Sequence, residues 1–137
     1  MPGAALIAPR SYIPQRMSIS ERPLGDITVL DIRGHIMYED GDQELRDAMA
    51  RTLQSGRRKV ILNMAEVPYV DSAGLSELVR AYVAIKKAGG RVVLLDVGRK
   101  VHDVLTIANL LRIFKVVESE EEAIQHLNEP RESGQVS

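Results

Sequence analysis

The order of strand-like and helix-like segments constrains this chain more than any other feature of its sequence. Two extended segments and a helix come first, and three units of a short apolar strand followed by an amphipathic helix come after them. Alternation of this kind predicts an α/β fold in a single domain: a mixed, mostly parallel sheet of about five strands, an N-terminal β-hairpin and about four helices. The expected strands are Met17–Arg22, Ile27–Ile32, Lys59–Leu62, Arg91–Leu95 and Ile113–Val117.

Turn and capping residues mark where these elements begin and end. Gly25-Asp26 predicts a tight turn between the first two strands. The spacing of Ser119 and Glu122 is that of a capping box, which predicts the start of the last helix. The best-defined helix ends at Gly89-Gly90. Its apolar stripe is expected to contain Leu75, Leu78, Val79, Tyr82 and Val83, and its outward face Glu77, Arg80, Lys86 and Lys87.

Polarity does not alternate along the short strand Lys59–Leu62. A strand with one solvated face alternates between apolar and polar residues, whereas a strand covered on both faces is apolar throughout. This strand is therefore expected at the centre of the sheet.

Length, charge and composition exclude several classes of protein. A chain of 137 residues has room for one domain but not comfortably for two. A net charge of -1 gives no basic excess for nucleic acid or an acidic membrane, and no apolar run is long enough to span a bilayer. The absence of cysteine excludes disulfides, thiolate catalysis and cysteine-based zinc sites, and it is typical of the reducing cytoplasm.

The two ends of the chain differ in composition from its middle. Prolines at 2, 9 and 14 predict a disordered leader over residues 1–15, because the short apolar stretch there lacks the pattern of a signal peptide. Pro130 is expected to stop the last helix and to leave a flexible tail at residues 129–137. One folded domain at residues 16–128 remains.

The segment Val67–Leu75 joins a buried strand to the best-defined helix. Ligands and partners of open α/β sheets bind beyond the carboxyl ends of the strands, so this is where a site is expected. Asp71 or Ser72 can cap the helix by accepting a hydrogen bond from a free backbone N–H. Alternatively, the Ser72 hydroxyl accepts a phosphoryl group, which would add about -1.5 to -2 charge next to Asp71. Gly74 has no Cβ, so another surface could approach this turn closely.

The same segment resembles the signature of the STAS family, the sulphate-transporter and anti-sigma-factor-antagonist domains. The resemblance is carried by Val60–Met64 and by Val70–Leu75, with Asp71-Ser72-Ala73-Gly74-Leu75 as its specific part. It continues through Ala84–Gly90, Val92–Leu95 and Leu105–Val117, so it covers nearly the whole chain from Met17 to Leu127.

The resemblance implies the function of an anti-sigma factor antagonist, which is a binding protein and not an enzyme. In such proteins the serine at the position of Ser72 is phosphorylated by a partner that is both an anti-sigma factor and a histidine-kinase-like serine kinase. The unphosphorylated form captures that partner and frees the sigma factor, and a serine phosphatase reverses the modification. The residues implied in partner binding are Asp71, Ala73, Gly74, Leu75, Ser76, His35, Ile36 and Met37.

One loop departs from the family pattern. After the second strand, family members carry Gly-x-Leu/Ile-Asp before a helix, and here Met37 stands where that aspartate is expected. The segment Gly34–Asp42 is also slightly longer than the pattern. Since this loop forms part of the partner surface in the family, the departure bears on which partner is bound.

Two other functions share the implied fold. The first is the STAS subunit of a bacterial lipid-transport ABC complex, which binds its ATPase without phosphorylation. The second is a scaffold in a stress-sensing assembly. Members of the fold also form dimers in crystals, so a weak homodimer stays open as an alternative.

Enzymatic and cofactor sites have little support in the sequence. A serine hydrolase would need Gly-x-Ser-x-Gly around Ser72, but Val70 occupies the first glycine position. The histidines His35, His102 and His126 are expected at the surface rather than paired with a nucleophile. No phosphate-binding glycine motif is present, and we expect neither a cofactor nor a metal.

Overall fold

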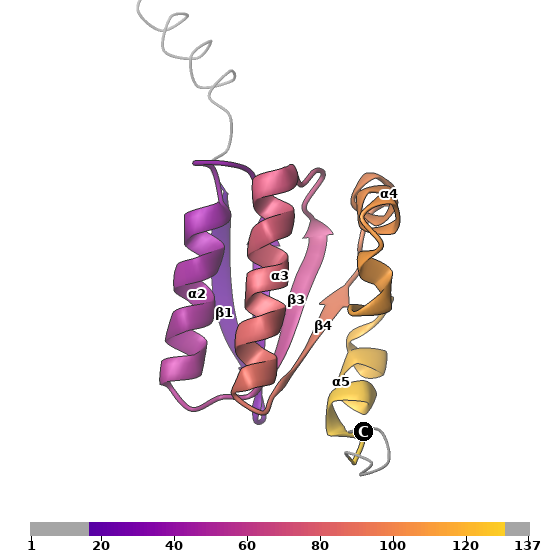
Figure 1. Ribbon diagram of the computed structural model, residues 1–137. Helices are drawn as coiled ribbons and strands as arrows, with labels where there is room; N and C mark the ends of the chain where they lie inside the picture. Colours follow the sequence, from indigo (N-terminus) through magenta and orange to yellow (C-terminus); the bar gives the residue numbers. More distant parts are fainter. Residues whose placement is uncertain (1–16, 131–137) are drawn as a thin grey trace, which may run out of the picture.

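The computed structural model describes residues 17–130, which form one five-stranded sheet covered by helices (Figure 1). The strands follow one another across the sheet in the order β1-β2-β3-β4-β5. This confirms the expected α/β domain with a mostly parallel sheet. The strands are β1 Ser18–Leu24, β2 Ile27–Arg33, β3 Lys59–Glu66, β4 Arg91–Leu95 and β5 Lys115–Val117.

The strand directions are those expected from the sequence. β1 and β2 pair antiparallel through the turn at Gly25-Asp26, with Leu24 opposite Ile27. All later pairs are parallel. The carboxyl ends of β3 and β4 therefore lie at the same edge of the sheet, which is the upper edge in Figure 1, and α3 begins at that edge.

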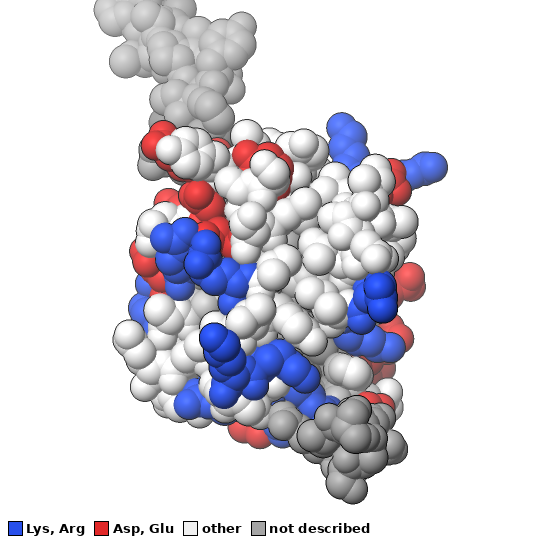
Figure 2. All heavy atoms as spheres, viewed as in Figure 1, with Lys and Arg blue, Asp and Glu red and all other residues white. Residues whose placement is uncertain are grey.

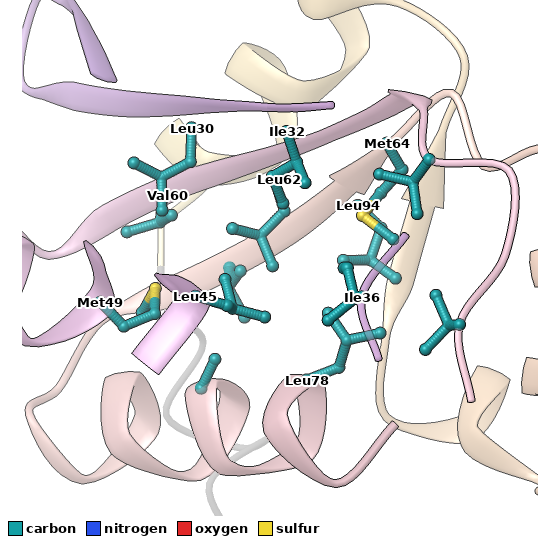
Figure 3. Packing of buried hydrophobic residues seen from close by; sticks show 14 of the residues in the cluster. Leu30, Ile32, Ile36, Leu45, Met49, Val60, Leu62, Met64, Leu78 and Leu94 are labelled. Atoms are coloured by element: carbon teal, nitrogen blue, oxygen red, sulfur yellow. The ribbon is translucent and has the colours of Figure 1, made fainter. Parts of the chain in front are cut away.

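Helices cover both faces of the sheet. The larger core lies between one face of the sheet and the helices α2, α3 and α4, and Figure 3 shows its strand, loop and helix side chains in contact. The smaller core packs α5 against the opposite face. Val60 and Leu62 point into the first core and Ile61 into the second, which confirms that β3 is covered on both faces. The helices are α2 Asp42–Gln54, α3 Ser72–Lys87, α4 Arg99–Ile107, the 3-10 turn η1 Leu110–Arg112, and α5 Glu120–Asn128.

The last strand is shorter than the sequence predicted. The N–H groups of Ile113 and Phe114 donate to the carbonyl of Leu110, at 3.1 Å each, so the chain is still in a turn where Ile113 was expected to start the strand. Pairing with β4 begins only at Lys115. The 3-10 turn η1 at Leu110–Arg112 is too short to produce a periodic pattern in the sequence, so it was not predicted.

The outward face of α3 was predicted incorrectly at two positions. Glu77, expected to face solvent, is only 4% exposed, and its carboxylate forms ion pairs with Arg46 of α2 and, at 3.4 Å, with Arg80. Val83, expected in the apolar stripe, is 41% exposed. The stripe is rotated because α2 packs against α3, and a buried carboxylate is tolerated there when guanidinium groups pair with it.

This buried carboxylate gives a first prediction. Arg46→Leu is expected to lower the melting temperature, because it leaves Glu77 buried with a single longer ion pair. The double variant Arg46→Leu/Glu77→Leu should recover most of the loss, since two apolar side chains of similar size replace the pair. Thermal unfolding followed by circular dichroism measures both. A double variant less stable than Arg46→Leu alone would contradict this account.

Among the described residues, regular secondary structure runs from Ser18 to Asn128, and the domain limits of 16 and 128 stay a prediction. The leader predicted at residues 1–15 lies outside the described residues, as does the tail from residue 131 onward. Within residues 17–130, no helix is both long enough and apolar enough to cross a membrane.

Candidate functional site

Ser72 is the first residue of α3 and lies exposed at the carboxyl edge of the sheet. Its hydroxyl makes no hydrogen bond within residues 17–130, and only its carbonyl is engaged, by the Ser76 hydroxyl at 3.0 Å. The helix cap is Asp71, whose side chain accepts from the Gly74 N–H at 2.8 Å. The structure thus decides between the two capping residues that the sequence left open, and the Ser72 hydroxyl has no structural task.

Asp71 joins two segments that are far apart in the chain. One carboxylate oxygen accepts from Gly74 N–H, and the other accepts from Tyr38 N–H at 3.1 Å. Hydrogen bonds from backbone N–H groups to a carboxylate are stronger than those between neutral groups. Asp71 therefore fastens the loop after β2 to the start of α3.

The loop after β2 extends the sheet toward Ser72. Ile36 forms a parallel bridge with Val70: its N–H donates to the Tyr69 carbonyl at 3.2 Å, and its own carbonyl accepts from Asp71 N–H at 3.3 Å. A Cβ on Gly74 would lie 2.0 Å from the Ile36 carbonyl oxygen. The close approach that the sequence anticipated at Gly74 is thus made by the chain's own loop.

The rest of this loop is a compact turn that leads into α2. Met37 and Asp40 exchange two backbone hydrogen bonds of 2.9 Å. Gly41 has φ +112°, and a Cβ there would meet the His35 carbonyl oxygen at 2.6 Å, so only glycine fits. The Glu44 side chain accepts from Gly41 N–H at 3.1 Å and closes the start of α2. Met37, which departs from the family pattern, takes part through its backbone.

The residues expected to bind a partner are brought together, but they differ in exposure. Ser72 and Ser76 are exposed. Ile36 and Gly74 are buried and lie beneath the surface, where they hold the loop against α3. The half-buried members of the set are Asp71, Ala73, Leu75, His35 and Met37.

Two tyrosines beside Ser72 were not singled out from the sequence. Tyr38 is 68% exposed and Tyr69 is 41% exposed. Tyr69 precedes Ser72 by three residues, and the backbone of Tyr38 is fixed by Asp71. A sequence signal existed, because both tyrosines lie in segments expected to form loops at the carboxyl edge of the sheet. Their proximity depends on the hydrogen bond from Tyr38 to Asp71, which sequence spacing does not reveal.

The surface beside Ser72 is acidic. The upper left of Figure 2 shows acidic side chains gathered at the end of the molecule where α2 begins. Within residues 17–130 none of the acidic residues in the loop after β2 forms an ion pair, and the segments 34–45 and 67–79 contain no Lys or Arg. Arg46 and Arg80, which directly follow these segments, both pair with Glu77. The acidic residues of the loop are Glu39, Asp40, Asp42 and Glu44.

The histidines are not arranged for catalysis with Ser72. His35 lies against the Tyr69 ring, with centroids 6.4 Å apart at 71°, and its Nδ1 is buried without a hydrogen bond. His102 and His126 lie on α4 and α5. No histidine hydrogen-bonds the Ser72 hydroxyl within residues 17–130, so the part of the chain described here holds no Ser–His pair. The same residues contain no group of His, Asp and Glu suited to a metal ion.

A polar pocket of about 270 Å³ lies away from Ser72, on the face of the sheet that α5 partly covers. Its charged groups are already paired: Asp31 with Arg22 at 2.6 Å and with the Asn63 amide at 2.7 Å, and Arg33 with Glu66 at 3.7 Å. The pocket therefore offers a ligand few unpaired groups.

Asp31 in this pocket gives a prediction for pH. Its hydrogen bonds with Arg22 and Asn63 hold the pKa of Asp31 below its ordinary value of 3.8. The ion pair thus contributes stability that is complete above about pH 4 and is lost as the pH falls through the folded-state pKa. Asp31→Asn should unfold at lower urea concentration at neutral pH, with a flatter dependence in acid. Asp103→Asn is the control, because Asp103 is exposed and its carboxylate accepts no hydrogen bond from the residues that the structure describes. Equal slopes for Asp31→Asn and wild type would contradict the assignment.

Comparison with known proteins bears on the whole described domain. The family model described as STAS domain matches residues 19–123. Among curated proteins, the chain is 30% identical over 81 residues to BtrV of Bordetella bronchiseptica, a candidate anti-sigma factor antagonist. That match covers 59% of this chain and 70% of BtrV.

Solved structures share the fold. A candidate anti-sigma factor antagonist from Thermotoga maritima superimposes with a TM-score of 0.76 at 24% identity, over 81% of this chain and 95% of the other. The anti-sigma factor antagonist SpoIIAA of Bacillus, solved in unphosphorylated and phosphorylated forms, gives a TM-score of 0.63 for each, at 16% and 18% identity. These matches cover 82% and 81% of this chain and all of SpoIIAA.

Proposed function

The chain belongs to the STAS domain family, and we propose that it acts there as an anti-sigma factor antagonist switched by phosphorylation of Ser72. In its unphosphorylated form it binds an anti-sigma factor with histidine-kinase-like serine kinase activity. Phosphorylation by that partner releases it, and a serine phosphatase restores it. The protein acts in the cytoplasm as a regulator of sigma-factor-dependent transcription and not as an enzyme.

The free hydroxyl of Ser72 is the observation that carries this proposal. A serine that caps a helix is committed to a backbone N–H, and phosphorylation would remove that cap. Here Asp71 performs the capping at 2.8 Å, and Ser72 stands exposed beside it. The hydroxyl is therefore accessible to a kinase, and its modification leaves the α3 cap intact.

The position of Ser72 explains how a phosphate could act without unfolding the domain. At the first position of α3 the group meets the positive end of the helix dipole, which tolerates about -1.5 to -2 added charge. A partner that covers Ser72 must instead strip water from a dianion, which costs several kcal/mol when no buried counter-charge is present. A phosphate on Ser72 would thus weaken binding because the partner has to cover it.

The SpoIIAA structures support the choice of a phosphorylation switch, because that relative is known in phosphorylated and unphosphorylated forms. The alternative, a subunit of a lipid-transport ABC complex that binds without phosphorylation, predicts that Ser72 can be changed without consequence for binding.

Pull-down from lysate of the native host tests the proposal, with wild type, Ser72→Ala and Ser72→Glu as baits. Mass spectrometry should identify a histidine-kinase-like ATPase on the wild-type and Ser72→Ala baits and not on Ser72→Glu. Thr106→Glu, which places the same charge on an exposed position of α4 outside the expected partner-binding residues, is the matched control for charge alone and should retain the partner. If all baits retain one partner equally, such as a transporter ATPase, the switch at Ser72 is wrong.

A further inference from the structure

Two large aromatic side chains are exposed in the two segments that form the site around Ser72. Tyr38, 68% exposed, projects from the loop after β2, and Tyr69, 41% exposed, precedes α3. Tyrosine presents a large apolar surface with only two side-chain torsions to immobilise, and it is enriched among the residues that dominate binding energy in protein interfaces.

The backbone beneath each tyrosine is held in place. Tyr38 N–H donates to the Asp71 carboxylate at 3.1 Å, and the Tyr69 carbonyl accepts from Ile36 N–H at 3.2 Å. The Tyr69 ring also packs edge-on against His35. A surface that is ordered before its partner arrives loses less conformational entropy on binding. The two tyrosines are therefore presented on a preorganised platform.

Four acidic residues of the loop after β2 border this platform. Glu39 is exposed at the tip of the loop, and Asp40, Asp42 and Glu44 follow within five residues. The carboxylates of Asp40, Asp42 and Glu44 accept backbone hydrogen bonds, but within residues 17–130 none of the four meets a Lys or Arg in an ion pair. An interface is stabilised when the potentials of its two sides are complementary. The complement of this border is a basic surface.

We propose that Tyr38 and Tyr69 anchor the chain to its protein partner, and that the partner receives them in an apolar pocket bordered by Lys or Arg side chains. This inference rests on the proposed function, since the partner is the anti-sigma factor that covers Ser72. Asp71 is the positioning residue, because it fixes Tyr38 beside the start of α3. The tyrosines set affinity, and the acidic border speeds association.

The acidic border and the phosphate act at different places in this interface. Charges at the rim stay partly hydrated and mainly change the association rate and its dependence on salt. A phosphate on Ser72 lies next to Asp71, the residue that holds Tyr38, so a partner anchored at Tyr38 has to strip its water, and the phosphate mainly raises the dissociation rate. A basic border on the partner is therefore compatible with release on phosphorylation.

The test measures association and dissociation rates by biolayer interferometry, at low and high salt, against the purified histidine-kinase-like ATPases of the native host. Tyr38→Ala and Tyr69→Ala should each weaken binding about thirtyfold, mostly through faster dissociation. Ile107→Ala is the matched control, since Ile107 is 85% exposed and lies on α4, outside the segments 34–45 and 67–79. Glu39→Lys should slow association several-fold at low salt only, with Glu121→Lys on α5 as its control.

The outcomes separate this inference from the proposed function. Weak binding by both tyrosine variants with an unchanged Ile107→Ala supports the anchors, even if Ser72→Glu binds as wild type and so overturns the switch. Wild-type binding by both tyrosine variants overturns the anchors, even if Ser72→Glu fails to bind. If no ATPase binds wild type, both proposals are wrong. If sedimentation instead shows a dimer that Tyr38→Ala dissociates, a second copy occupies this surface and the inference is overturned.

Discussion

Gly74→Ala is expected to destabilise the domain by about 3 kcal/mol, a large effect for the addition of one methyl group. The new Cβ would lie 2.0 Å from the Ile36 carbonyl oxygen and 2.7 Å from a methyl group of Val70. Both neighbours are backbone or buried side chain, so neither can move aside cheaply. The loop after β2 must separate from α3, and the bridge between Ile36 and Val70 is lost with it.

Urea unfolding followed by circular dichroism measures the loss. Gly98→Ala is the matched control, because Gly98 also lies at the start of a helix but, among the described residues, nothing lies within 4 Å of its Cβ position, and the change should cost less than about 1 kcal/mol. The Gly74 variant should also bind the partner poorly, since its two binding segments no longer lie together. A Gly74→Ala protein as stable as Gly98→Ala would show that the contact with Ile36 is looser than described.

Asp71→Ala is expected to cost about 2 to 3 kcal/mol, because one side chain serves both as helix cap and as loop fastener. Loss of an N-cap typically costs about 1 kcal/mol, and a hydrogen bond to a charged group contributes about 1.5 kcal/mol when it is exposed to solvent, as at Tyr38. The amide of Tyr38, released from the carboxylate, should exchange its hydrogen much faster. The urea midpoint measures the loss of stability, and hydrogen exchange at the Tyr38 amide measures the release of the loop.

Ser119→Ala is the control for this prediction. Ser119 caps α5 through a single hydrogen bond to Glu122 N–H at 3.1 Å and fastens no loop, so its removal should cost only about 1 kcal/mol. Exchange at Tyr38 should be unchanged in that variant. An Asp71→Ala protein that loses stability while Tyr38 stays protected would mean that Asp71 is only a cap.

The elements of this fold were predictable wherever local pattern decides structure. β-Branched residues and a Gly-Asp turn define the first hairpin. The consecutive apolar residues within Lys59–Leu62 place β3 at the centre of the sheet, because such a strand is covered on both faces. The errors lie where tertiary contacts override pattern. Glu77 reads as a surface residue until α2 brings Arg46 to it, and no local signal contains that pairing.

The candidate site was predictable in its centre and not at its border. Asp71, Ser72 and Gly74 follow from their position at the end of a strand and the start of a helix. Which of the first two residues caps α3 depends on side-chain direction, which the sequence leaves open. The place of Tyr38 depends on a hydrogen bond between residues 33 positions apart, and such long-range contacts have no signature in a single sequence.

Phosphorylation in vitro tests the central claim most directly. The purified histidine-kinase-like ATPase of the host, given ATP, should transfer one phosphoryl group to wild type, and tandem mass spectrometry should locate it on Ser72. Ser76→Ala, which removes the neighbouring exposed hydroxyl, should be modified like wild type, and Ser72→Ala should not be modified. Phosphate on another residue, or equal modification of Ser72→Ala, would contradict the account.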